Sequence, residues 1–206
     1  MGFLSAFHKR SSSDRQPVEK FSTVVTKYLK QLDDLDGTMR ERNITLIARS
    51  PAAPTARAIL QTAQEIERQQ VSVQIIFSKL APVEMLIELA TSLHISPRGN
   101  SASTIRFIKN PSLLNAHEQL VLGTRICWTG DMLRRSEEQR NGLDLLEENA
   151  PGSVCLGELA FNAMWKVAKP LPARAFVAPR RTAPAPSVLL PALAAAELAE
   201  NSAPIR

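Results

Sequence analysis

Long apolar runs are missing from this chain of 206 residues. None approaches the roughly 18–20 residues that a membrane span requires, so we predict no transmembrane segment. The short apolar start between Phe3 and Phe7 ends at His8-Lys9-Arg10 and is too brief for a secretory signal. A cytoplasmic protein is therefore expected.

Cysteine is scarce as well, with Cys127 and Cys155 as the only two. Their positions match neither the spacing of metal ligands nor a disulfide framework. We expect both thiols to be reduced and partly buried, and we predict no metal site and no cofactor.

Aromatic residues make up 5% of the chain, which leaves few side chains to stack on nucleic-acid bases. The net charge is +5, but the basic residues are scattered among acidic ones, as is typical of a solvated surface. Nucleic acid is therefore a less favoured partner, and salt-sensitive binding would be its sign.

An amphipathic helix is predicted to begin at Pro17 and to end before Gly37, within a segment that we place at 17–42. Its apolar positions recur every three or four residues and are Phe21, Val24, Val25, Tyr28, Leu29, Leu32 and Leu35. This stripe would pack on a sheet or, alternatively, on a second copy of the chain. Residues 1–16 are polar and Ser-rich and are expected to form a flexible tail.

Residues 43–170 alternate between strand and helix patterns. Apolar runs predict buried strands at 44–48 and 71–77, and helical spacing connects them at 56–66. The later expected elements are a helix from Pro82, a strand at 104–109, a hairpin within 116–131, a helix from Ser136 and a last helix from Ser153 to about Lys166. This order favours an α/β fold with a mixed β-sheet of about five strands flanked by helices.

The last helix is predicted to bury two apolar stripes. The first is Phe161, Trp165 and Ala168, and the second is Leu156, Ala160, Ala163, Met164 and Val167. Beyond it, residues 171–206 are rich in Pro and Ala and are expected to be a disordered tail. Within this tail, 188–198 could form a short helix that docks on a protein partner, although a tail without such a role is the simpler interpretation.

The hairpin within 116–131 holds the candidate site. Because side chains alternate along a strand, His117, Gln119 and Val121 face one side, and Glu118, Leu120 and Leu122 face the other. Gly123 would allow the chain to reverse into a second strand, which ends at Gly130-Asp131.

This hairpin resembles the phospholipase D superfamily. The family signature is a His, any residue, a Lys, four residues and an Asp, followed by a strand that ends in Gly-Ser with an Asn shortly after. In this chain His117 stands at the His position, Gln119 at the Lys position, Thr124 at the Asp position and Arg134 at the Asn position, while Gly130-Asp131 replaces the Gly-Ser pair. The order of elements over 43–170 also fits one half of that fold.

The resemblance implies an altered phosphodiesterase site. In the family the His attacks phosphorus, a second His from another copy of the motif protonates the leaving group, and the Lys stabilises charge on the phosphoryl oxygens. Gln119 carries no charge, and the Asp131 carboxylate would repel a phosphate unless it is protonated or paired with a cation. The chain has only two other histidines, His8 and His94, so a second catalytic His would most simply come from a homodimer.

Two functions follow from this resemblance. The favoured one is a non-catalytic phospholipase D-like domain that acts through binding or assembly, in which His117 is a strand histidine bonded to Gln119 or to a turn hydroxyl. The alternative is a homodimeric phosphodiesterase or nuclease that uses His117, with Arg125, Arg134 or Arg135 replacing the missing lysine charge.

Overall fold

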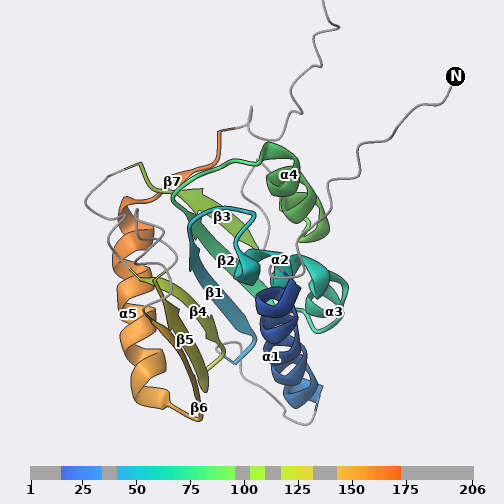
Figure 1. The fold of residues 1–206 in the computed structure, drawn as a ribbon, viewed down its shortest axis with the longest axis vertical. Coiled ribbons are helices and arrows are strands. Elements are labelled where there is room, and N and C mark those ends of the chain that lie inside the picture. The colour runs from blue at the N-terminus through green and yellow to red at the C-terminus, as the bar shows by residue number, and fades with distance from the viewer. Residues whose placement is uncertain (1–14, 34–40, 96–102, 110–116, 132–142, 173–206) are drawn as a thin grey trace, which may run out of the picture.

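The computed structural model describes residues 15–33, 41–95, 103–109, 117–131 and 143–172. They form a mixed sheet with helices on both faces (Figure 1), so the predicted α/β class is confirmed. The sheet has seven strands in the order β6-β5-β4-β1-β2-β3-β7, rather than the predicted five. The strands are β1 Asn43–Ala48, β2 Ser72–Phe77, β3 Thr104–Phe107, β4 Glu118–Leu122, β5 Ile126–Gly130, β6 Asp144–Glu148 and β7 Lys169–Pro170. The helices are α1 Arg15–Asp33, α2 Pro54–Gln61, α3 Ala63–Arg68, α4 Val83–Ser92 and α5 Pro151–Val167.

One half of the sheet is parallel because helices return the chain between its strands. β1 pairs with β2, and β2 with β3, in the same direction, with α2 and α3 in the first connection and α4 in the second. All three strands therefore end at the same end of the sheet, which we call the carboxyl end.

The other half is antiparallel and is built on the predicted hairpin. β4 pairs with β1 on one side and with β5 on the other, and β6 continues the sheet beyond β5. Gly123 forms the hairpin turn at φ +55°, and its N–H donates to Asn43 O at 2.8 Å. A Cβ at this position would stand 2.8 Å from Glu41 O, so both the backbone angle and the space require glycine.

The two faces of the sheet are covered differently. Helices α1 to α4 lie on one face, and α5 alone lies on the other (Figure 1). The larger core fills the first layer and includes Val25, Leu29, Leu46 and Ile75, each fully buried. A smaller cluster beneath α5 is centred on Phe161, packed against strand residues Ile47 and Ile76.

Several predicted elements differ from the structure. The single helix expected over 56–66 is divided at Thr62, whose hydroxyl donates to Ala58 O within the helix at 3.0 Å. The helix expected from Ser136 is wrong over 144–148, which form β6 against β5 instead, and residues 132–142 lie outside the described part of the chain. The last helix begins at Pro151 and not at Ser153, since proline fits a first helical turn.

The second stripe predicted for the last helix is also wrong. Phe161 and Ala168 are buried and Trp165 packs beside them, as predicted, but the outward face of α5 carries Leu156 at 70% exposure. The other exposed positions of that stripe are Ala160, Ala163 and Val167, and only Met164 is buried.

The predicted segment boundaries can be compared at both ends. Helix α1 begins at Arg15, so it includes the last two residues of the predicted N-terminal tail. Leu171 is buried in the larger core, so the predicted tail at 171–206 does not begin there. The rest of both predicted tails, together with Leu35 and Gly37, lies outside the described residues. No helix in the described ranges has the length and apolar character needed to cross a membrane.

Candidate functional site

The hairpin brings His117 and Asp131 together at the carboxyl end of the sheet. His117 directly precedes β4 and Asp131 directly follows β5, and the register pairs Glu118 with Gly130 between them. His117 Nδ1 lies 2.7 Å from Asp131 Oδ1. The prediction that His117 bonds to Gln119 or to a turn hydroxyl is therefore wrong, because its partner is the Asp131 carboxyl group.

The two partners differ in exposure. The Asp131 side chain is 5% exposed and the His117 side chain is 46% exposed. A buried carboxylate bonded to Nδ1 fixes the ring orientation and leaves Nε2 outside that contact. The pair thus presents an oriented imidazole at the surface, and the Asp131 carboxylate has a cationic partner whenever His117 is protonated.

Glu118 is a second carboxyl group at this end of the sheet. Its side chain is fully buried, and Oε1 accepts a hydrogen bond from Arg49 N–H at 2.6 Å. Within the described part of the chain, Oε2 is buried without a hydrogen-bond partner. Burial raises the pKa of Glu118 to about 7, so this carboxyl group is largely protonated below neutral pH.

A row of basic residues follows the parallel strands. Arg49 comes directly after β1, Lys79 lies two residues after β2, and Lys109 lies two residues after β3. Continuing the β1–β4 register, in which Ile47 pairs with Gln119, places Arg49 opposite His117. Since adjacent strands lie about 4.8 Å apart, the three basic residues extend from His117 across the carboxyl end.

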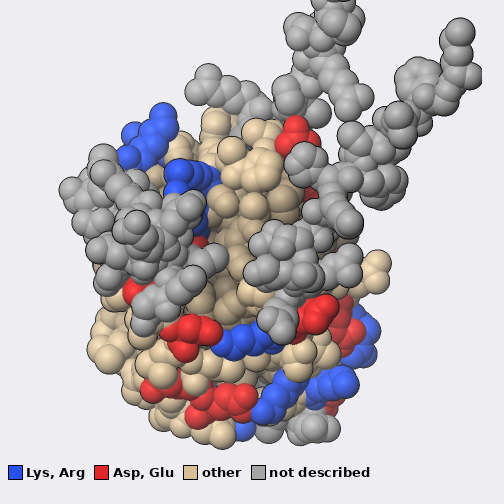
Figure 2. Space-filling model, viewed as in Figure 1, with Lys and Arg blue, Asp and Glu red and all other residues tan. Residues whose placement is uncertain are grey.

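Sequence reasoning missed this row, although each apolar run is followed within two residues by a cation. Figure 2 shows Lys and Arg side chains near β3 and β7 at the upper left, whereas charges of both signs alternate at the lower end of the molecule. The row also begins at the junction between β1 and β4, where the parallel half of the sheet meets its antiparallel half.

Gln119 is not part of the open site. Its amide packs under α5, with Nε2 3.7 Å from Cys127 Sγ, and a Cβ added at Gly157 would overlap it. Because Ile47 and Gln119 are paired on the α5 face, this side chain belongs to the layer beneath the helix.

The remaining predicted site residues are divided between several places. Thr124 and Arg125 lie in the hairpin turn, separated from His117 by the five residues of β4, or roughly 17 Å at 3.3 Å per residue. Gly130 ends β5, and a Cβ there would overlap the Trp128 indole, so its role is to make room for that ring. Arg134 and Arg135 lie outside the described residues.

Metal ligands and thiols are the remaining reactive groups to consider in the described part of the chain. No group of three or more His, Cys, Asp or Glu side chains there could hold a metal ion. Cys127 is buried, as expected, but Cys155 is exposed on α5. A scan against family models and a search of the curated proteins find no match to this chain.

Proposed function

We propose that this chain is a phospholipase D-like domain that acts through binding or assembly and does not hydrolyse phosphodiesters. The observation that carries the proposal is the packing of Gln119 beneath α5. This residue stands where the family has its lysine, so that position supplies no positive charge to a phosphoryl group. Loss of one such electrostatic contact typically costs about 3–4 kcal/mol of transition-state stabilisation.

The charge next to His117 supports the same proposal. The Asp131 carboxylate is 2.7 Å from Nδ1 of His117. Negative charge beside the attacking imidazole would repel a phosphodiester. We further propose that the domain works in the cytoplasm with its two cysteines reduced, as a homodimer or with a protein partner bound through its tails.

The alternative, a homodimeric phosphodiesterase or nuclease, rests on a different observation. Asp131 orients the His117 imidazole, and Arg49, Lys79 and Lys109 follow the strands at the same end of the sheet. These cations could replace the family lysine, whereas Arg125 lies in the hairpin turn. His94 follows α4, which leads the chain away from the carboxyl end, and His8 lies outside the described residues. Among the histidines that the structure describes, the second would therefore have to be His117 of another copy.

Hydrolysis assays separate the two functions. Purified protein would be given bis(p-nitrophenyl) phosphate and single- and double-stranded DNA, with light scattering on the same sample and His94→Ala as the matched control for His117→Ala. We expect no turnover by the parent chain. Turnover that is lost in His117→Ala, retained in His94→Ala and confined to the dimer would overturn the proposal in favour of the phosphodiesterase.

A variant that restores two family residues tests whether the position of Gln119 explains the inactivity. In Gln119→Lys combined with Asp131→Ser, the lysine would lie beneath α5 and His117 would lose its Asp131 partner, so we expect no phosphodiester hydrolysis above the parent background, and hydrolysis would contradict this explanation. DNA binding without hydrolysis, weakening steeply with added salt, would instead support a nucleic-acid-binding domain.

A further inference from the structure

The outward face of α5 is an exposed apolar surface. In the described part of the chain, the large hydrophobic side chains that are exposed are Leu145, Leu156, Leu159 and Val167, and the last three lie on this helix. Leu156 is 70% exposed and Leu159 is 62% exposed. Because α5 alone covers its face of the sheet, its outward side is the outermost layer of the described fold (Figure 1). Exposed apolar side chains gathered in this way mark an interaction surface.

The charge that borders this surface is positive. Lys166 is the only charged residue at the exposed positions of α5, because Glu158, the one acidic residue of the helix, is partly buried. Lys169 is exposed directly beyond the helix, in β7. Along the sequence, no acidic residue occurs between Glu158 and Glu197. The surface therefore combines apolar side chains with charge of one sign.

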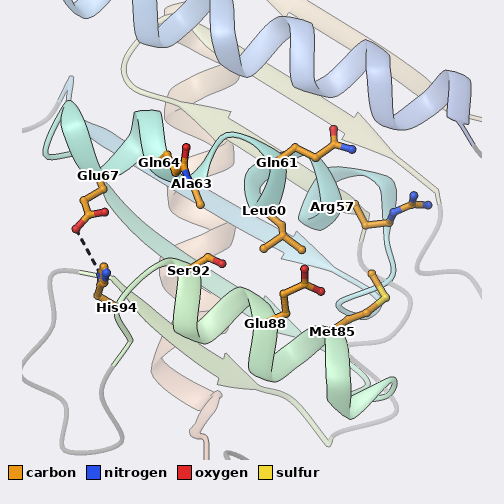
Figure 3. A pocket seen from close by; sticks show the side chains of 10 residues that line it. All are labelled: Arg57, Leu60, Gln61, Ala63, Gln64, Glu67, Met85, Glu88, Ser92 and His94. Atoms are coloured by element: carbon orange, nitrogen blue, oxygen red, sulfur yellow. Dashed lines mark ion pairs between the residues drawn. The ribbon is translucent and has the colours of Figure 1, made fainter.

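The groove between α4 and the pair formed by α2 and α3 differs in both respects (Figure 3). Its lining is mostly polar and carries Arg57 and Glu88, which have opposite charges. Glu67 already contacts His94, with Oε1 3.4 Å from Nδ1. The α5 face is therefore the stronger candidate for a binding surface.

We propose that the outward face of α5 binds the surface of an anionic membrane. Leu156, Leu159 and Val167 enter the boundary between the headgroups and the acyl chains, while Lys166 and Lys169 extend to the anionic headgroups. This peripheral binding needs no helix that spans the bilayer. It goes beyond the function proposed above, because it uses none of the residues at the His117 site.

The size of the surface favours a membrane over a second copy of the chain. Helix α5 has 17 residues and is about 25 Å long. A strip about 10 Å wide along it covers on the order of 250 Å², whereas each partner in a standard interface buries about 800 Å². A second copy would also bring Lys166 against apolar side chains, since the exposed positions of α5 hold no carboxylate to pair with it.

The aromatic side chain nearest the lysines argues against nucleic acid as the partner. Trp165 is partly buried, is stacked on Phe161 at 5.3 Å and has the Arg106 guanidinium 4.3 Å from its ring centroid. Little of its ring is therefore left to stack on a base. Nucleic acid would also leave the exposed leucines of α5 without an apolar partner.

Vesicle co-sedimentation with the full-length chain tests the proposal. The probes are vesicles of phosphatidylcholine alone and vesicles of equal parts phosphatidylcholine and phosphatidylserine. We expect the parent to bind the phosphatidylserine vesicles much more strongly than the others. Leu156→Glu with Leu159→Glu should abolish this binding and leave the urea midpoint unchanged, because both side chains are exposed. His117→Ala should bind as the parent does, which keeps this test separate from the hydrolysis assays.

Lysine substitutions test the role of charge. Lys166→Gln with Lys169→Gln should weaken binding to the phosphatidylserine vesicles about 25-fold, since each basic residue near an anionic surface contributes about fivefold. Lys27→Gln with Lys30→Gln is the matched control. It changes the net charge equally on α1, which covers the opposite face of the sheet, and should bind as the parent does.

A fluorophore on the exposed Cys155 thiol of α5 reports contact directly. With an environment-sensitive label there, phosphatidylserine vesicles should shift the emission to the blue. The same label at Thr23→Cys of α1, in a Cys155→Ser background, should show no shift.

Three results would overturn the proposal. The first is no vesicle binding by the parent, and the second is binding that survives Leu156→Glu with Leu159→Glu. The third is a dimer that forms without vesicles and dissociates in this leucine variant, which would assign the face to a second copy.

Discussion

Glu118 is a single residue whose proton equilibrium should shape the pH dependence of folding. Burial raises its pKa to about 7, although the hydrogen bond from Arg49 N–H opposes this. An unfolded glutamate titrates near 4.5, so between these pH values the folded chain holds a proton that the unfolded chain has lost. The Glu118 contribution to the free energy of unfolding should therefore fall as pH rises through this interval and stay constant above it.

Glu118→Gln should remove this pH dependence, because glutamine keeps the size and the acceptor for Arg49 N–H but cannot ionise. The difference in the free energy of unfolding between the variant and the parent should increase in favour of the variant by up to about 3 kcal/mol as the pH rises from about 5 to about 8. Urea unfolding at a series of pH values measures it. Glu84→Gln on the exposed side of α4 is the control and should show no such gain. A parallel pH profile for Glu118→Gln and the parent would contradict the burial argument.

Gly157 is the residue that accommodates Gln119 beneath α5. A Cβ there would overlap Gln119 Nε2 and stand 3.0 Å from Val121 Cγ2. Gly157→Ala should therefore lower the free energy of unfolding by about 1–3 kcal/mol more in the parent than in a Gln119→Ala background. Gly152→Ala is the matched control on the same helix, because nothing lies within 4 Å of a Cβ added there. Equal effects of Gly157→Ala in both backgrounds would mean that the two side chains do not share this space.

At the level of elements, β6 is held to the sheet and to α1 through Asp144. Trp128 Nε1 of β5 donates to Asp144 Oδ1 at 2.7 Å, and Lys20 Nζ of α1 donates to the same carboxylate at 2.7 Å. Asp144→Ala leaves the buried indole N–H without this acceptor and should lower the free energy of unfolding by about 1–2 kcal/mol. Since the Lys20 hydrogen bond lowers the pKa of Asp144, the carboxylate contribution should be present above about pH 4 and lost in more acidic solution.

Glu148→Ala, at the opposite end of β6, is the comparison for that variant. Glu148 pairs with Lys27 of α1 at 2.5 Å, but both side chains are well exposed. Loss of this ion pair in Glu148→Ala should lower the free energy of unfolding by no more than about 1 kcal/mol. An equal or larger effect than that of Asp144→Ala would contradict the role given to the Trp128 hydrogen bond.

The elements that the sequence predicts correctly are those with strong local patterns. β1, β2 and the hairpin have apolar runs or a glycine turn, and each lies where the pattern places it. β6 has the mixed sequence Asp-Leu-Leu-Glu-Glu, and its strand conformation depends on pairing with β5, which no local pattern reveals. Helix α5 is apolar on several sides, so periodicity does not fix its rotation. Its observed rotation places Gly157 and Phe161 against the sheet.

Only part of the candidate site can be predicted from the sequence. The hairpin pattern gives the positions of His117 and Asp131 at one end of two paired strands, but their contact depends on the register, which pairs Glu118 with Gly130. The row formed by Arg49, Lys79 and Lys109 requires the strand order β4-β1-β2-β3, which brings together residues from distant parts of the chain. Local periodicity carries no information about that order.

At the level of the whole molecule, one sheet connects two separate layers of core. Trp128 lies in the layer under α1, where it packs edge-on against Phe21 with ring centroids 4.7 Å apart. Trp165 lies on the α5 side, stacked on Phe161 at 5.3 Å, with the Arg106 guanidinium 4.3 Å from its ring centroid. Because β1 and β2 contribute to both layers, we expect the described fold to unfold in a single cooperative transition.

Two single-tryptophan variants test this cooperativity. Trp165→Phe leaves Trp128 as the reporter for the α1 layer, and Trp128→Phe leaves Trp165 as the reporter for the α5 layer. Within each variant, the urea midpoint from tryptophan fluorescence should equal the midpoint from far-ultraviolet circular dichroism, whatever the stability cost of the substitution itself. An earlier fluorescence midpoint in Trp128→Phe alone would mean that α5 separates before the sheet opens. The layer that contains Gln119 and Gly157 would then be an independent unit.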